Sequence, residues 1–149
     1  MKVAGAMEWL SWSDLSPALL YEVLRFRQDI FVVEQRCAYS ELDGRDQDAR
    51  HLLLRIGGTV AGYLRLIPDA GNKQVRLGRV AVAAAHRRGG LAQRLMAEAL
   101  ARCRADYPGF AIALSAQAHL VAFYAGFGFT PVSPPYDDEG IPHVDMVNA

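Results

Sequence analysis

The chain has 149 residues, which fits a single domain (1–149) and is too short for two separate hydrophobic cores. Hydrophobic residues make up 52% of the chain and charged residues 21%, a globular composition that excludes a disordered, collagenous or disulfide-dense protein. Lysine plus arginine and aspartate plus glutamate number 16 each, so the formal charge of zero predicts no nucleic-acid partner and no membrane partner.

The first predicted elements are a short strand over residues 7–12 and a long helix. Ser16 is a typical N-cap residue, and Pro17 is typical of the first helical position. Apolar residues then recur at helical spacing to about residue 35, with a break or bend expected near the middle. Three charged residues are expected to lie off this apolar stripe: Arg25, Arg27 and Asp29.

A long polar loop is predicted over residues 36–50, and its length is more typical of binding than of a simple connection. Antiparallel strands follow at 51–56 and 60–67, because the intervening Gly57-Gly58 pair indicates a two-residue hairpin. A third strand is expected over 74–83.

Helices and strands alternate in the second half of the chain. A helix is predicted over 89–105, a buried strand over 110–115 and a short helix over 119–125. Strands at 129–133 and 141–147 complete the sheet. The turn expected between them holds two prolines and three acids: Pro134, Pro135, Asp137, Asp138 and Glu139.

The cysteines and the N-terminal segment indicate the cellular compartment in which the protein is expected. Cys37 and Cys103 lack CxxC spacing and zinc-type histidine partners, so we expect two free thiols and no metal site. No basic leader precedes an apolar run, and no apolar stretch approaches the ~20 residues of a membrane-spanning helix. These features predict a cytoplasmic protein.

The most informative motif is the turn between the third strand and the next helix. Here Arg87-Arg88-Gly89-Gly90 combines positive charge, glycines that allow close backbone approach, and the unpaired N–H groups of a helix start. We therefore expect a pyrophosphate site, the alternative being an ordinary loop before a solvated helix. Neither the Walker A motif nor the dinucleotide fingerprint fits, because no Gly-Lys-Ser/Thr occurs and the preceding strand belongs to an antiparallel run.

A second motif lies further along, where Phe123-Tyr124 precedes Gly128-Phe129. Together with Arg87-x-x-Gly90-x-Ala92, this order of motifs resembles the Gcn5-related N-acetyltransferase superfamily, in which the first motif binds the pyrophosphate of coenzyme A. The matches run from about residue 25 to 146 and further resemble the ElaA branch. Four segments carry this closer likeness: Phe31–Gln35, Gly78–Val80, Ser115–Leu120 and Gly140–His143.

The resemblance implies an α+β fold with a mixed, mostly antiparallel central sheet and helices on both faces. In this superfamily the cofactor strand splays away from the next strand, here 110–115, and the pantetheine arm lies in the V-shaped cleft. Backbone groups of Val80 and Val82 are then expected to bond the pantetheine amides, and one N–H to polarise the thioester carbonyl. The implied cofactor is acetyl-coenzyme A, and its expected binding residues are Val80, Ala81, Val82, Arg87, Arg88, Gly89, Gly90, Leu91, Ala92 and Gln93.

The implied reaction is direct attack by a primary amine on the thioester in a ternary complex. By motif position Tyr124 gives a proton to the departing thiolate, the alternative being a core aromatic residue beside Phe123 and Phe127. Many members of the superfamily carry a glutamate on the cofactor strand as base, but this chain has Arg79 and no carboxylate over 74–85.

Histidines are the remaining candidates for the base, because imidazole titrates near neutral pH. His119, close in sequence to Tyr124, comes first, followed by His51 and His143. Bulk water, or an amine that enters already neutral, is the alternative.

The acceptor is expected to be a small-molecule or peptide amine. The acidic Glu34 and Asp43 suit a cationic acceptor, whereas Arg65 and Arg79, if both point into the cleft, favour one that carries a carboxylate. His51 is the remaining residue expected at this side of the cleft.

Two other functions stay open at this point. An acyl-homoserine-lactone synthase or other longer-acyl transferase needs an apolar tunnel that no insertion obviously supplies. A noncatalytic coenzyme A sensor or interaction module is favoured only by the missing strand carboxylate. Homodimers are common among such folds, but nothing in the sequence locates an interface.

Overall fold

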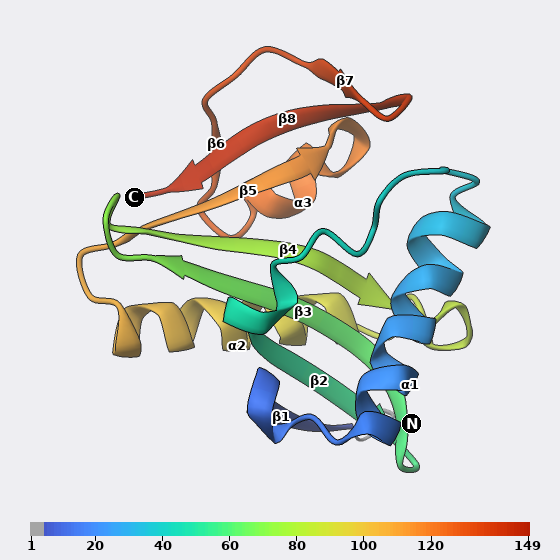
Figure 1. Cartoon of the computed structure of the whole chain (residues 1–149). Helices are drawn as coiled ribbons and strands as arrows, with labels where there is room; N and C mark the ends of the chain where they lie inside the picture. Colours follow the sequence, from blue (N-terminus) through green and yellow to red (C-terminus); the bar gives the residue numbers. More distant parts are fainter. Residues whose placement is uncertain (1–4) are drawn as a thin grey trace.

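Eight strands form one mixed sheet in the computed structural model, which describes residues 5–149 (Figure 1). The strands are β1 (Ala6–Ser11), β2 (Arg50–Ile56), β3 (Thr59–Asp69), β4 (Gln74–Val82), β5 (Ala111–Gln117), β6 (Thr130–Pro131), β7 (Tyr136–Asp138) and β8 (Ile141–Asn148). Their order is β1-β2-β3-β4-β5-β8-β6, with β7 paired to β8. Among the described strands, β4 and β5 make the single parallel pair, so the expected mixed, mostly antiparallel sheet is confirmed.

Helix α1 (Pro17–Gln28) covers one face of the sheet and begins as expected. The Ser16 hydroxyl accepts a hydrogen bond from the Leu19 amide at 3.1 Å, which satisfies one of the free donors of the first turn. The predicted break is a change to the π-helical segment η2 (Asp29–Glu34). The placement of Arg27 off the buried stripe is wrong: its side chain is fully buried because acidic partners from a distant loop surround it.

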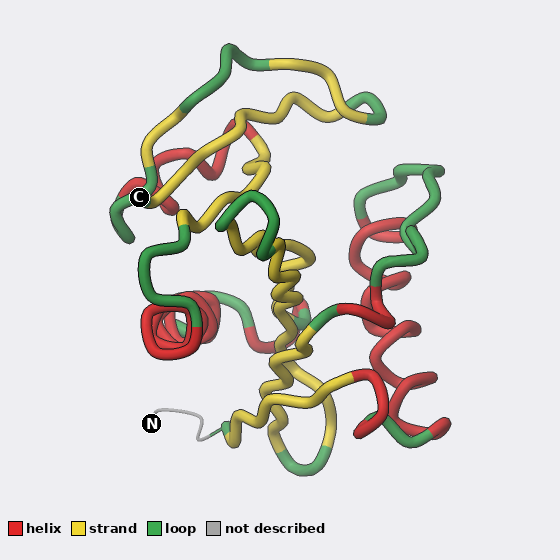
Figure 2. Tube along the Cα trace, turned by 60° about the vertical axis from the view of Figure 1, so that its left-hand side comes forward, coloured by secondary structure: helices red, strands yellow, loops and turns green. Residues whose placement is uncertain are grey.

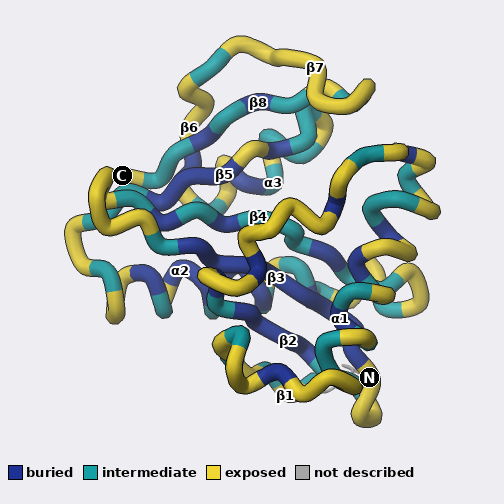
Figure 3. Tube along the Cα trace, in the orientation of Figure 1, coloured by how far each residue is buried: buried dark blue, intermediate teal, exposed yellow. Residues whose placement is uncertain are grey.

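Helices α2 (Leu91–Asp106) and α3 (Val121–Ala125) lie on the opposite face, so that the sheet separates them from α1 (Figure 2). Most of the core lies between this face and α2. Leu95 and Met96 of α2 pack in one cluster with Leu64, Leu114 and Met146, and a smaller cluster around Val23 lies under α1. The central strands are accordingly the most buried part of the chain (Figure 3).

The region before β8 differs from the sequence expectation. The strand predicted over 129–133 shrinks to the two residues of β6, in a segment whose prolines cannot donate to a ladder. The expected turn contains strand β7, which forms a hairpin with β8. Glu139 and Gly140 both have positive φ (53° and 83°), the geometry that a tight two-residue hairpin requires.

Strands β4 and β5 part after a short stretch of pairing, and this creates the space for a site (Figure 1). They pair only where Gln74–Arg76 lies beside 111–113. On its other edge β4 carries a bulge, because Tyr63 faces Ala81 whereas Arg65 faces Gly78, leaving 79–80 opposite a single residue. Arg79 there has a φ of 55°, and the bulge redirects the strand where it leaves β5.

Candidate active site

A pocket of about 450 Å³ lies between the diverging halves of β4 and β5. Its floor is formed by β4 from Leu77 to Val82 and by β5 from Leu114 to Gln117. Segment η2 and the loop after it form one wall, and Tyr124 of α3 and the β7–β8 hairpin contribute to the other. Three parts of the chain that are distant in sequence therefore meet at the splay.

Many of the expected site residues line this pocket. They are Glu34, Arg79, Val80, Ala81, Val82, Arg87, His119 and Tyr124. A second group lies at the turn and helix start that follow Arg87, outside the lining: Arg88, Gly89, Gly90, Leu91, Ala92 and Gln93. A third group lies outside both the pocket and the turn: Asp43, His51 and Arg65.

The glycine turn has an exposed backbone. Arg88 and Gly90 adopt positive φ values of 66° and 81°, and helix α2 begins at Leu91. A Cβ atom added at Gly90 would meet nothing within 4 Å, and one at Gly89 would meet the His86 carbonyl at 3.6 Å. Within the described part of the chain, no side chain caps the first turn of α2, so its N–H groups are available to an anion, as in other helix-start sites.

Arg87 connects this turn to the opposite wall. Its guanidinium donates two hydrogen bonds to the Glu34 carboxylate, at 2.6 and 2.9 Å, and a third from Nε to the Val82 carbonyl at 3.0 Å. The hydrogen bonds from Arg87 lower the pKa of Glu34 below its usual value. Glu34, expected on the acceptor side, therefore lies beside the expected pyrophosphate site.

Tyr124 belongs both to the aromatic core and to the lining of the pocket. Its ring packs edge-on against Phe123 and Phe129, with centroid separations of 5.1 and 6.2 Å, and it also lines the pocket. Burial raises the pKa of its hydroxyl to about 12. The hydroxyl thus stays protonated at any physiological pH and is available as a hydrogen-bond donor.

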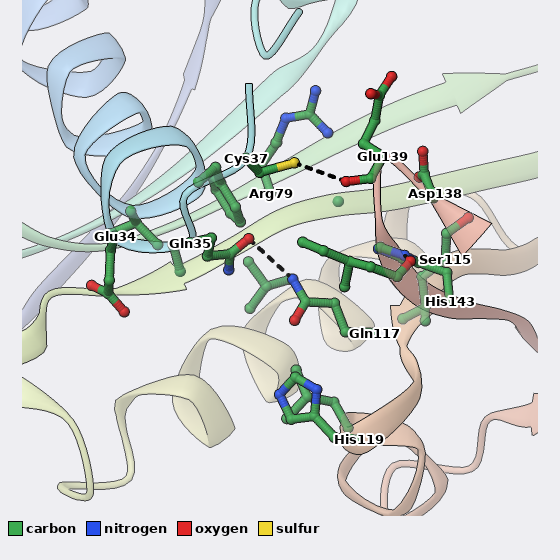
Figure 4. A pocket seen from close by; sticks show the side chains of 18 of the residues that line it. Glu34, Gln35, Cys37, Arg79, Ser115, Gln117, His119, Asp138, Glu139 and His143 are labelled. Carbon is green, nitrogen blue, oxygen red and sulfur yellow. Dashed lines mark hydrogen bonds between the residues drawn. The ribbon is translucent and has the colours of Figure 1, made fainter. Parts of the chain in front are cut away.

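Two contacts cross the pocket and join its walls (Figure 4). The Gln117 amide donates to the Gln35 side-chain oxygen at 3.3 Å, and the Cys37 thiol donates to the Glu139 carbonyl at 3.4 Å. We call the Gln35–Gln117 contact the glutamine bridge. In Figure 4, His119 lies on one side of this bridge, and Ser115 and His143 lie on the other.

Beneath α1 lies a group of buried ion pairs, here called the buried ionic cluster. Arg27 bonds Glu41 and Asp46, each at 2.7 Å, and Arg79 bonds the same Glu41 at 2.7 Å. Arg65 completes it through Asp43 at 2.7 Å and Asp46 at 3.1 Å. The cluster fastens the loop after η2 to the sheet and to the bulge of β4. Its members are Arg27, Glu41, Asp43, Asp46, Arg65 and Arg79.

This cluster corrects the expected acceptor side. Of the two arginines that were to point into the cleft, Arg79 lines the pocket, whereas Arg65 is buried against Asp43 and Asp46. His51 is also outside the pocket: its Nδ1 shares a hydrogen bond with the Tyr63 hydroxyl, and its Nε2 bonds the Asp46 carbonyl at 3.0 Å. Burial lowers the pKa of His51, so the ring is neutral and both nitrogens are occupied.

Several lining residues were missing from the sequence-based site. Asp138 and Glu139 come into the pocket because β7 folds back on β8, a pairing hidden by the turn-like composition of that segment. Tyr39 and Cys37 belong to a loop without periodicity, so no pattern indicates where they point. The polar lining residues to which the sequence assigned no role are Cys37, Ser115, Asp138 and Glu139, whereas His143, one of the candidate bases, does line the pocket.

Within residues 5–149, no helix has the length and apolar character to cross a membrane. Over the same range, no group of three or more histidine, cysteine, aspartate or glutamate side chains is arranged to hold a metal ion.

Comparisons with known proteins agree with the geometry. The acetyltransferase (GNAT) domain family matches residues 22–148. Protein ElaA of Escherichia coli is 41% identical over 145 residues, covering 94% of this chain and 95% of its own length, and a UPF0039 protein of Synechocystis is 39% identical over 141 residues, covering 93% and 92%. The solved structure of an acyl-CoA N-acyltransferase from Pseudomonas aeruginosa matches with a TM-score of 0.93 at 38% identity, covering 98% of this chain and all of that one. The structure of Escherichia coli ElaA matches with a TM-score of 0.92 at 37% identity and the same coverage. The resemblance found in the sequence, including the ElaA branch, is thereby confirmed.

Proposed function

The chain belongs to the GNAT acetyltransferase family, and on that premise we propose that it transfers an acetyl group from acetyl-coenzyme A to a primary amine of a small molecule or peptide. The observation that carries this proposal is the pocket at the splay of β4 and β5, with Arg87 beside one end and Tyr124 in its wall. We further propose direct attack in a ternary complex. A cytoplasmic location stays a prediction.

The residues at the splay fit coenzyme A in charge and in backbone exposure. Beyond Arg76, the edge of β4 facing the pocket has no strand partner, so its backbone groups are available to amides. The open backbone at Gly89 and Gly90 and the guanidinium of Arg87 suit a pyrophosphate. When bound, the cofactor would supply an acetyl thioester.

Three groups of the chain would then act on the reaction. The N–H groups of Val80 and Val82 on β4 would donate hydrogen bonds to carbonyl oxygens of the cofactor, and one of these N–H groups would polarise the thioester carbonyl. The raised pKa of Tyr124, about 12, lies above that of an ordinary thiol at ~8.5, so Tyr124 would donate a hydrogen bond to the sulfur as charge develops there. When coenzyme A binds, the Arg87 guanidinium would leave the Glu34 carboxylate and bond phosphate oxygens instead.

A thiol-release assay with acetyl-coenzyme A and a panel of amines tests the proposal. We expect at least one amine to raise thiol release well above the rate of hydrolysis, and Tyr124→Phe to reduce that rate. Coenzyme A binding without amine-dependent turnover would favour a sensor instead. Repeating the assay with longer acyl thioesters tests the acyl-homoserine-lactone-synthase-like and longer-acyl alternatives, since preference for a long chain would contradict acetyl transfer.

A further inference from the structure

A primary amine is an ammonium ion at neutral pH and must lose a proton before it can attack. The residues of β4 include no carboxylate to accept it. Glu34 lines the pocket, but it lies beside the turn expected to bind the pyrophosphate, and Figure 4 places it on the opposite side of the pocket from the β7–β8 hairpin. Asp138 and Glu139 are exposed at the hairpin turn, and a carboxylate is in general a weaker base than an imidazole. A neutral imidazole is the better-matched acceptor in this pocket.

Geometry separates the three candidate histidines. His51 lies outside the pocket with both nitrogens bonded. His119 is exposed on the short helical turn η5 (Ala118–Leu120), and Figure 4 places it across the glutamine bridge from His143 and Ser115. His143 is half-buried on β8 and lines the pocket beside the β7–β8 hairpin.

The ring of His143 is held in one tautomer. Its Nδ1 lies 2.8 Å from the carbonyl oxygen of Ile141, and because a carbonyl only accepts, Nδ1 carries the hydrogen. The neutral ring therefore has its lone pair on Nε2. The Tyr136 ring stacks on it at a centroid distance of 6.2 Å and an interplanar angle of 29°, which fixes the plane of the imidazole.

From these observations we propose that His143 is the general base that takes the proton of the acceptor ammonium, an inference that rests on the proposed N-acetyltransfer. The cleft then divides by role. Arg87 and the glycine turn serve the acyl donor, whereas His143 and the β7–β8 hairpin serve the amine.

An ionised carboxylate lies near His143 on the same strand. Asp145, on the same strand, accepts hydrogen bonds from Tyr136 at 2.6 Å and Ser115 at 2.9 Å, and these bonds lower its pKa and keep it ionised. Arg76 donates a hydrogen bond to the same Ser115 hydroxyl at 2.7 Å and is a further charged neighbour of Asp145. The ionisable groups that face or flank His143 are Cys37, Tyr39, Arg76, Arg79, Tyr136, Asp138, Glu139 and Asp145.

The reaction converts an ammonium ion and a thioester into an amide, a thiol and a released proton. Nε2 of His143 takes one proton from the ammonium and later releases it to solvent. The nitrogen lone pair forms the C–N bond to the acetyl carbon, and the C–S bond breaks with its electron pair left on sulfur. The second proton leaves the nitrogen as the amide forms and passes to sulfur, with the Tyr124 hydroxyl hydrogen-bonded to the sulfur throughout. The products are an N-acetyl amine, the free thiol and one proton.

The test uses His143→Asn, because the asparagine amide can occupy the place of Nδ1 and keep the bond to Ile141 while removing Nε2. Rates are measured between pH 5 and 9 with a simple alkylamine and with trifluoroethylamine, which is unprotonated at neutral pH. We expect the turnover number for the alkylamine to fall by about 100-fold at pH 7, with loss of the acidic limb of the pH profile, and a much smaller fall for trifluoroethylamine. Unchanged coenzyme A affinity and thermal unfolding verify the fold of the variant.

His119→Asn is the matched comparison, the same substitution across the glutamine bridge. An equal loss with both amines and a retained acidic limb in His143→Asn would show a merely structural role and overturn the inference. A selective loss in His119→Asn alone would transfer the role of base to that residue. If the wild-type enzyme binds coenzyme A but acetylates no amine, the proposed function itself fails, an outcome separate from an active enzyme that is indifferent to His143.

Discussion

Arg87 has two competing partners, and their competition predicts how Glu34 affects cofactor affinity. The pair between Arg87 and Glu34 is more than a third exposed on both sides and is worth about 0–1 kcal/mol. A charge-assisted contact to phosphate contributes about 1.5–3 kcal/mol. Binding exchanges the first for the second, so Arg87→Ala should weaken coenzyme A binding by about 0.5–3 kcal/mol, or roughly 2- to 150-fold. Glu34→Gln should tighten binding by up to about 1 kcal/mol, roughly 5-fold, because the guanidinium starts free.

Isothermal titration calorimetry with coenzyme A measures both effects, and the double variant supplies the control. If Glu34 acts only through Arg87, Glu34→Gln should not change the affinity for coenzyme A once Arg87 is alanine. The coupling energy of this double-mutant cycle should then equal the whole effect of Glu34→Gln in the wild-type background. Weaker coenzyme A binding by the Glu34→Gln variant would refute the idea that Glu34 competes with the phosphates for Arg87. Unchanged affinity in Arg87→Ala would refute the phosphate contact itself.

Other predictions concern the tyrosine, the glycine turn and the buried ionic cluster. Tyr124→Phe should lower the turnover number by about 100-fold with little change in coenzyme A affinity, and steady-state rates check this. Gly90→Asp should strain the turn by about 1–2 kcal/mol and abolish tight coenzyme A binding by adding a negative charge. Gly90→Asn, which tolerates a φ of 81°, controls for the strain. Tight binding of coenzyme A by the aspartate variant, measured by calorimetry, would contradict the geometry. Arg27→Met should reduce the free energy of unfolding by up to about 3 kcal/mol in urea denaturation, because Glu41 and Asp46 each lose one of their two arginine partners. Burial pushes the pKa of Asp43 up, but the hydrogen bonds from Arg65 hold it at about 2, so its stabilisation should be complete above pH ~4 and lost as pH falls towards 2. Asp43→Asn should flatten that part of the stability profile, and an unchanged profile would contradict the assignment.

The sequence predicts most of the fold because its signals are local. Ser16 and Pro17 mark the start of α1, and Gly57-Gly58 mark the hairpin between β2 and β3, each through the chemistry of neighbouring residues. Strand β7 was missed since its residues are all exposed and carry no alternating pattern. Its pairing depends on β8, which a local reading does not consider.

In the candidate site, too, local motifs could be predicted from the sequence, whereas contacts with distant segments could not. The motif around Arg87 and the motif around Tyr124 are each local in sequence, and both lead to residues at the pocket. Arg27 has the composition of a solvent-facing helix residue, yet it is buried because Glu41 and Asp46 come from a loop brought close by folding. Arg65 and His51 likewise face away from the pocket for reasons that lie in their partners. The choice among histidines depends on the Ile141 carbonyl and the Tyr136 ring, which no spacing in the sequence reveals.

The short seam between β4 and β5 has a mechanical consequence. Backbone bonding holds the two parts of the sheet together over only Gln74–Arg76 and its neighbours on β5, while side chains of the shared core and the contacts from Gln35 and Cys37 reinforce the junction. A ligand that bonds both separated edges would act as an additional strand and stiffen this hinge. Protection of β5 and β8 amides from hydrogen exchange should therefore rise on coenzyme A binding more than protection of β2 and β3, even though those strands are part of the same sheet.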